Sequence, residues 1–146
     1  MSPTFQTPDW AKQAIWYQIF PERFRNGDPS NDPPGTHRWQ SRWYSTLPGE
    51  TGQFYRDVWR RRFGGDLQGI LQQLPYLRRL GVNAIYLTPI FKADDYHKYD
   101  TLDHRHVDDH FGFKGDIDQL IGETDDPMTW QWTPTDQLFL HFLDEA

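Results

Sequence analysis

Two short apolar runs, with an amphipathic stretch between them, dominate the hydrophobic pattern of this chain. Residues 14–20, AIWYQIF, are rich in aromatic and β-branched side chains and stop at Pro21, which predicts a buried strand. Residues 83–88, NAIYLT, predict a second buried strand ending at Thr88-Pro89. With a helix between them, the two strands form one predicted βαβ unit. A parallel pair with a right-handed crossover is the usual arrangement of such a unit.

The helix of this unit is predicted by apolar residues that recur at spacings of three and four. Asp66 is a suitable N-cap, and Gly81 suits the position just after the last turn. Pro75 lies inside the run, and we expect it to kink the helix or to end its first half, because proline has no backbone N–H. The apolar positions are Leu67, Ile70, Leu71, Leu74, Leu77 and Leu80.

The last third of the chain has a weaker pattern. Residues 113–132 show no sustained period and contain several Gly, Pro and Trp residues, so they predict a loop-rich excursion with one short helical turn around residues 117–121. Thr133, Pro134 and Asp136 then supply a cap, a proline at the first helical position and an acid in the first turn. A second helix is therefore predicted to begin at Thr133.

Composition bounds the possible functions. The chain has 146 residues, enough for one core, whereas a closed (β/α)8 barrel needs roughly 250. Its net charge of −6 argues against a nucleic-acid partner. It has no cysteine, no leader-like amino terminus and no apolar stretch of membrane-spanning length, so we expect a cytoplasmic protein without a membrane partner. Seven Trp residues suit either core packing or sugar platforms, and both interpretations stay open.

The first group of candidate functional residues lies in residues 26–36, NGDPSNDPPGT. This segment, the oxygen-rich loop, carries carboxylate and amide oxygens among turn-forming residues. Hard cations such as Ca²⁺ take such oxygens as ligands. Asn and Asp also fill turns without any metal, so a calcium site and a simple turn are both possible at this point.

A second polar segment follows the second predicted strand and is crowded with His, Asp and Tyr. In α/β folds, chemistry is found on the loops at the carboxyl ends of the strands. His97, His104, His106 and His110 together suggest a transition-metal site. His97 and Tyr99 equally suit hydrogen bonding to a ligand and stacking on it, and a purely structural role is a third possibility.

Three segments, in this order and spacing, carry a family resemblance: AIWYQIFPERFRNGDPSNDP, FGGDLQGILQQLPYLRRLGVNAIYLTPIF and HKYDTLDHRHVDDHFG. They resemble the amino-terminal part of the α-amylase family of retaining glycoside hydrolases, above all its cyclomaltodextrinase- and neopullulanase-like members. The resemblance implies an α/β fold, a partial (β/α)8 TIM barrel. It also implies three regions: residues 1–91 as the amino-terminal part of the catalytic barrel, residues 92–132 as a B-region-like loop at the substrate site, and residues 133–146 as the start of the next barrel helix.

The resemblance also implies an activity and a site. The activity is hydrolysis of α-linked glucans, such as starch, maltooligosaccharides, cyclodextrins or pullulan. Tyr99 would be the aromatic platform under a glucose ring, Asp100 would hold that ring's hydroxyls, and His97 would lie close by. A structural calcium ion would be held by Asn26, Asp28, Asn31, Asp32, the Gly64 carbonyl and Asp66. His104 and Asp109 stand where the family usually has Tyr and Pro, which affects the expected loop conformation more than sugar contact.

Catalysis itself is not expected from this chain. Retaining hydrolysis needs two carboxyl groups about 5 Å apart, and the resembled family supplies them from later barrel strands. We assign no catalytic residue and expect the chain alone to be inactive. The expected partners are an α-glucan and either the remainder of the barrel or a second copy, because two strands leave sheet edges unpaired. A non-catalytic carbohydrate-binding fragment and a metal-binding module are the alternatives.

Overall fold

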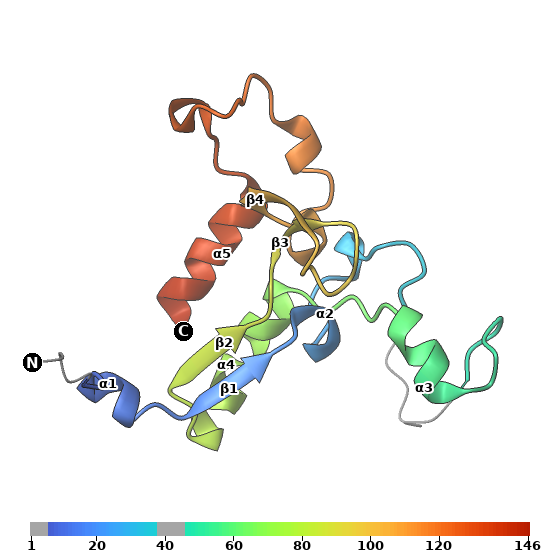
Figure 1. Ribbon diagram of the computed structural model, residues 1–146, viewed down its shortest axis with the longest axis horizontal. Helices are drawn as coiled ribbons and strands as arrows, with labels where there is room; N and C mark the ends of the chain where they lie inside the picture. The colour runs from blue at the N-terminus through green and yellow to red at the C-terminus, as the bar shows by residue number, and fades with distance from the viewer. Residues whose placement is uncertain (1–5, 38–45) are drawn as a thin grey trace, which may run out of the picture.

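The computed structural model describes residues 6–37 and 46–146 (Figure 1). Strand β1 (Trp16–Ile19) lies parallel to β2 (Ala84–Leu87), with Trp16 opposite Ala84 and Ile19 opposite Leu87. Helix α4 (Leu67–Leu80) lies between them in sequence. The predicted βαβ unit with parallel strands is therefore confirmed, but the expected burial of both strands was wrong: in β1 only Ile19 is buried, and β2 has no buried residue.

Helix α4 has the caps that the sequence predicts. The Asp66 side chain accepts a hydrogen bond from the Gly69 N–H, and Gly81 adopts a left-handed conformation with φ of 88°. The helix continues through Pro75, so the prediction that Pro75 ends its first half was wrong. Pro75 lies on the exposed side of the helix. On that side water can bond to the Leu71 carbonyl, which has lost its N–H partner.

The core forms where α4 meets the strands and the last helix, α5 (Pro134–Glu145). Helix α4 turns its buried leucines and isoleucine toward β1, and α5 contacts both α4 and the strand β4 (Thr101–Val107). The buried apolar side chains of this cluster are Ile19, Leu67, Ile70, Leu74, Leu77, Ile90, Val107, Phe111, Leu138 and Phe142.

A β-hairpin follows β2 where the sequence predicts only a loop. Strand β3 (Phe91–Ala93) pairs antiparallel with β4, with irregular register along β3. The hairpin is hidden in the sequence because the half-buried positions of β4 include the charged Asp103 and Arg105, while the apolar Leu102 is exposed. The Arg105 guanidinium donates hydrogen bonds of 2.9 Å to the Asp103 carboxylate, so these two charged side chains can be half-buried. The strand therefore lacks the alternation of apolar and polar residues that would predict it.

The excursion after the hairpin contains two short 3-10 helices, η4 (Ile117–Gln119) and η5 (Pro127–Thr129). The first confirms the predicted helical turn. Helix α5 begins as predicted, with Thr133 and Asp136 exchanging the two hydrogen bonds of a capping box. The remaining short elements are α1 (Asp9–Lys12), α2 (Pro21–Phe24), η1 (Pro29–Asn31), α3 (Phe54–Asp57), η2 (Val58–Arg60) and η3 (Asp109–Phe111).

The parallel sheet has two strands within the described residues, so each strand has one edge without a paired neighbour there. Large apolar side chains next to and on these strands are exposed: Ile15 at 56%, Trp16 at 55% and Tyr86 at 52%. Among the helices that the structure describes, none combines the length and the apolar character needed to cross a membrane.

Candidate functional site

The turn that joins β3 to β4 carries the residues predicted to contact sugar. Tyr99 is 66% exposed, and its backbone N–H donates a hydrogen bond of 3.1 Å to Nδ1 of His97. The two rings lie 5.9 Å apart between centroids, at 50° to each other. The structure therefore brings His97 and Tyr99 together on an open surface, beyond the carboxyl end of β2.

Two exposed acids flank His97. Nε2 of His97 lies 3.5 Å from Oδ2 of Asp95, and Nδ1 lies 3.7 Å from Oδ1 of Asp100. Because Nδ1 accepts the Tyr99 N–H, the ring proton belongs on Nε2, which faces Asp95. Asp100 also accepts a hydrogen bond from the Asp95 backbone N–H at 3.2 Å. All three predicted sugar residues thus share one turn. Within it, one ligand atom each from Asp95, His97 and Asp100 lies close enough to the others to hold a metal ion.

The turn is held from its amino-terminal side by contacts among aromatic rings and an arginine. Tyr96 lies 5.9 Å from the Phe20 ring, and the Arg23 guanidinium lies 4.9 Å from Tyr96 and 4.8 Å from Phe63. Such cation–π contacts are favourable on partly buried surfaces. The first strand, the crossover and the hairpin therefore meet under the turn that presents His97 and Tyr99.

The six predicted calcium ligands also converge, around the oxygen-rich loop. Nδ2 of Asn26 donates to Oδ1 of Asp32 at 2.6 Å. Gly64 has a φ of 70°, and a Cβ on it would lie 2.2 Å from the same Asp32 oxygen, so only glycine fits there. Asp28 caps η1 by accepting the Ser30 N–H, and Asn31 ends that helix.

Asp66 joins the loop to helix α4. Its Oδ1 accepts the N–H groups of Gly27 and Gly69, at 2.9 and 2.6 Å. Its Oδ2 accepts the N–H of Asp28 at 2.8 Å and the side-chain amide of Asn31 at 3.2 Å. Burial raises the pKa of Asp66, and these hydrogen bonds act in the opposite direction. One buried carboxylate therefore serves as both the helix cap and the clamp of the oxygen-rich loop.

The chemistry of the loop fits a hard cation in part. Oδ1 of Asn26 and Oδ1 of Asn31 are buried without a hydrogen-bond donor, and an oxygen in that position suits a metal ion. Burial raises the pKa of the neighbouring Asp32, and a bound cation would lower that pKa. Asp66 fits less well, because four N–H donors already occupy its two oxygens.

Comparison with known proteins decides the family. The model of the catalytic domain of alpha-amylase matches residues 18–127. The chain belongs to the α-amylase family. It is 49% identical to neopullulanase 2 of Thermoactinomyces vulgaris over 122 residues, which are 84% of this chain and 19% of that protein. It is also 49% identical to a cyclomaltodextrinase of Geobacillus thermopakistaniensis over 117 residues, 80% of this chain and 18% of the relative.

A solved structure supports the same assignment. The complex of the cyclic alpha-maltosyl-(1→6)-maltose hydrolase of Arthrobacter globiformis with its named sugar superimposes on 97% of this chain with a TM-score of 0.65. The sequence identity is 36%, and 24% of that chain is covered. The family's enzymes are (β/α)8 barrels, in which a parallel βαβ unit is the building block. This α-amylase-family chain spans about a fifth of the length of the curated relatives it matches.

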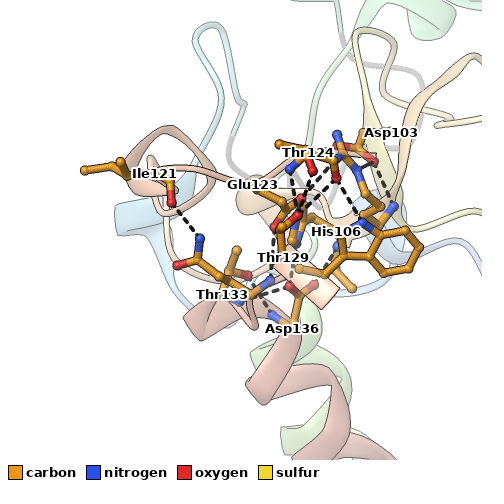
Figure 2. Close-up of polar contacts among 12 residues, drawn as sticks. Asp103, His106, Ile121, Glu123, Thr124, Thr129, Thr133 and Asp136 are labelled. Carbon is orange, nitrogen blue, oxygen red and sulfur yellow. Dashed lines mark hydrogen bonds and ion pairs between the residues drawn. The ribbon is translucent and has the colours of Figure 1, made fainter. Parts of the chain in front are cut away.

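The histidines of this family member do not form one metal site. His106 is 2% exposed, and its Nδ1 and Nε2 lie 2.8 Å from Asp136 and 2.9 Å from Glu123 (Figure 2). Both ring nitrogens are thus engaged by carboxylates, which leaves neither for a metal. His110 bonds to Asp108 at 3.0 Å, while His104 packs its ring 5.8 Å from that of Phe91. The hypothesis of a transition-metal site built from four histidines therefore has no geometric support.

Sequence reasoning missed the roles of His106 and Glu123. Figure 2 shows His106 linking the excursion, through Glu123, to the first turn of α5, through Asp136. Burial lowers the pKa of His106, but its hydrogen bonds to both carboxylates outweigh that effect, so the net shift is upward. The sequence offered one signal for this cluster, which is the capping box that places Asp136 in the first turn of a helix. From there its carboxylate can accept hydrogen bonds from His106 and the Val107 N–H of β4.

Proposed function

We propose that this chain is part of a glycoside hydrolase that acts on α-linked glucans by a retaining mechanism. The names of its relatives support a substrate among pullulan, cyclodextrins and maltose oligomers. Residues 1–91 would contribute the first two strands of the barrel, residues 92–132 the substrate-site region, and residues 133–146 the helix before the next strand. Strands β1 and β2, each with an open edge within the described residues, suit that placement.

One observation carries the proposal: Tyr99 presents its ring to solvent on the turn between β3 and β4, in the segment that follows β2. The C–H face of a pyranose packs well on an aromatic ring, while its hydroxyls need polar partners. Asp100 offers acceptor oxygens beside that ring, and Nε2 of His97 offers a donor. We propose that these three side chains hold a glucose unit, with Tyr99 as the platform.

Hydrolysis requires a carboxylate nucleophile and a carboxylic acid about 5 Å apart on either side of the bond. We assign neither role to this chain and propose that it is inactive alone. The buried acids that the structure describes each accept at least one hydrogen bond within the fold, so each has a structural role. They are Glu22, Asp57, Asp66, Asp108, Asp109, Asp116 and Asp136. The contribution of the chain would be to bind and orient the sugar.

A structural calcium ion at the oxygen-rich loop is part of the proposal. The unsatisfied oxygens of Asn26 and Asn31 support it, together with the half-buried carboxylate of Asp32. Asp28, the Gly64 carbonyl and Asp66 would complete the ligand set, which requires Asp66 to exchange some of its N–H donors for the ion. When bound, calcium would supply charge that fastens the crossover to helix α4.

Titration of the 146-residue chain with maltoheptaose, followed by calorimetry, tests the binding role. We expect binding by the wild type and at least about a tenfold loss of affinity, about 1.4 kcal/mol, in Tyr99→Ala. Tyr76→Ala is the control, since Tyr76 is a partly exposed tyrosine on α4, away from the turn. Equal affinities for all three proteins would refute the platform role. Release of reducing sugar from maltoheptaose by the wild-type chain would refute the proposed inactivity.

Within the described residues, two groups of side chains lie close enough to hold a metal ion: Asp95 with His97 and Asp100, and Asp108 with Asp109 and His110. The exposed group of Asp95, His97 and Asp100 favours the alternative of a metal-binding module more, because Asp108 and Asp109 already pair with Lys98 and Lys92. Its ligand atoms suit a divalent cation that takes nitrogen and oxygen donors. Stoichiometric zinc retained through dialysis and lost in His97→Ala would support this alternative over the sugar site. Zinc that is fully removed by dialysis would leave the sugar-binding proposal in place.

A further inference from the structure

Lys98, in the middle of the exposed turn, is itself buried. Its residue exposure is 2%, while the neighbouring Tyr99 is 66% exposed. Among the described residues, Lys98 is the one non-glycine residue with a positive φ, at 59°. A left-handed backbone is unfavourable for a lysine, so surrounding contacts must hold it.

Those contacts are made by the ammonium group of Lys98. Nζ donates to Oδ2 of Asp108 at 2.6 Å and to the Ala93 carbonyl at 2.9 Å, and it lies 5.8 Å from the centre of the Phe111 ring. Asp108 is fully buried. The Ala93 N–H donates to the same Oδ2 at 3.2 Å, and the His110 N–H donates to Oδ1 at 3.1 Å. One buried carboxylate therefore ties together β3, the turn and the start of η3.

The charge state of Asp108 agrees with this geometry. Burial opposes its ionisation, but the hydrogen bond from His110 and the charge and hydrogen bond of Lys98 outweigh burial and lower its pKa to about 2. The Asp108 carboxylate is thus ionised through the range in which proteins are usually studied. A buried ion pair adds little net stability compared with apolar residues, and in some proteins its role is instead to specify one conformation, because each charge tolerates few alternative partners.

The position of the anchor determines what the turn presents. The Lys98 side chain points inward while both neighbours remain at the surface, and the Lys98 carbonyl accepts the Thr101 hydroxyl at 3.1 Å. On the other side of His97, Tyr96 is held against Phe20 and Arg23. His97 and Tyr99 are therefore placed by buried anchors on both sides, and their 5.9 Å ring separation depends on the left-handed residue between them.

We propose that Lys98 is a positioning residue for the sugar platform: its buried bond to Asp108 fixes the left-handed turn that presents His97 and Tyr99 to one ligand. The sugar-binding part of this inference rests on the proposed function. The claim about the turn does not, because the relative placement of the two rings can be measured without any sugar.

The test compares four proteins. The double variant Lys98→Met with Asp108→Asn removes both charges and keeps similar volumes, so no stranded carboxylate remains. The double variant Lys98→Gly with Asp108→Asn permits the positive φ but has no anchor, which separates backbone freedom from the ammonium contact. Lys92→Met is the control, because it breaks the neighbouring pair of Lys92 in β3 and Asp109 in η3, which lie 3.3 Å apart. The wild type completes the set.

Two readouts are taken from each protein. Nuclear Overhauser cross-peaks between the His97 and Tyr99 rings, with the order parameter of the Tyr99 amide, report the turn; rigid backbone has an order parameter of about 0.85 and flexible backbone one below about 0.6. Calorimetry with maltoheptaose reports affinity. We expect both Lys98 double variants to lose the cross-peaks, to become flexible at Tyr99 and to bind the sugar at least about tenfold more weakly. Lys92→Met should match the wild type.

Three results would overturn the proposal. The first is a folded Lys98→Met double variant that keeps the cross-peaks and a rigid Tyr99. The second is a Lys98→Gly double variant that matches the wild type, because backbone freedom alone would then explain the turn. The third is loss of the far-UV circular dichroism of the fold in both double variants, which would assign Lys98 to overall stability. If the wild type binds no maltoheptaose, the proposed function fails, and the cross-peaks alone decide the role of Lys98.

Discussion

Replacing His106 with leucine should destabilise the chain by about 3 kcal/mol. Removing one partner of a buried charged pair costs about 3–5 kcal/mol, because the remaining charge is left without compensation. His106 is 2% exposed and lies 2.8 Å from Asp136 and 2.9 Å from Glu123. We expect the lower end of that range because both carboxylates keep other donors. These are the N–H groups of Val107 and Thr133 for Asp136, and Arg105 with the Gln131 N–H for Glu123.

The stabilising effect of His106 should depend on pH with a definite sign. The bonds to Asp136 and Glu123 outweigh burial and raise the pKa of His106 above its ordinary value of 6.5. The folded state therefore binds this proton more tightly than the unfolded state. The contribution is fully present below about pH 6.5 and is lost as the pH rises through the pKa of the folded state. His106→Gln keeps an amide donor without the charge, so its deficit relative to the wild type should shrink as the pH rises.

Urea unfolding followed by far-UV circular dichroism, at about pH 6 and about pH 9, measures these free energies of unfolding. His104→Leu is the control, since His104 is an exposed histidine on the same strand, and such surface changes usually stay within about 0.5 kcal/mol. Equal stability of the wild type and His106→Leu at the lower pH would refute the reasoning. A gap between the wild type and His106→Gln that widens with pH would refute the sign.

Two further predictions concern the oxygen-rich loop. Adding Ca²⁺ at about a hundred times its dissociation constant should stabilise the wild type by about 2.7 kcal/mol in a thermal melt, and chelation should reverse the effect. Asp32→Asn should lose most of this response; a calcium response that Asp32→Asn leaves unchanged would place the ion elsewhere. Gly64→Ala should destabilise by more than about 2 kcal/mol, because the new Cβ would lie 2.2 Å from the Asp32 carboxylate in a left-handed backbone. Gly35→Ala is the control, because Gly35 has a similar φ of 80° but a Cβ added there would have no atom within 4 Å. Urea unfolding of both variants therefore separates the cost of the Cβ contact with Asp32 from the cost of the backbone conformation. Equal losses of stability in the two variants would count against the contact.

The elements with apolar periodicity were predictable from the sequence. Helix α4 buries apolar side chains at regular spacings, and strands β1 and β2 are short runs of aromatic and aliphatic residues, so hydrophobicity locates all three even though most of the strand residues are not fully buried. The cap residues Asp66 and Thr133 located the starts of α4 and α5, because their side-chain oxygens suit free N–H groups. Strand β4 was not predicted, because its half-buried positions include Asp103 and Arg105, which are hydrogen-bonded to each other and give no apolar pattern.

The candidate site was predictable in membership but not in architecture. The family resemblance indicated His97, Tyr99 and Asp100 as candidate sugar contacts, and the structure places all three on the turn between β3 and β4. The burial of Lys98 could not be predicted, because lysine is almost always exposed and the partner that reverses this, Asp108, lies ten residues away across a turn. The role of His106 could not be predicted either, because its partners Glu123 and Asp136 are brought to its two ring nitrogens only by tertiary packing.

The central claim is that a glucose unit rests on the ring of Tyr99. The most direct measurement is nuclear magnetic resonance of the wild-type chain during titration with maltoheptaose, with saturation transfer from the sugar followed at each assigned aromatic ring. The account predicts transfer to the Tyr99 ring and shifted signals for His97 and Asp100, in proportion to bound sugar. Transfer confined to other aromatic rings, or no transfer at saturating sugar, would contradict it.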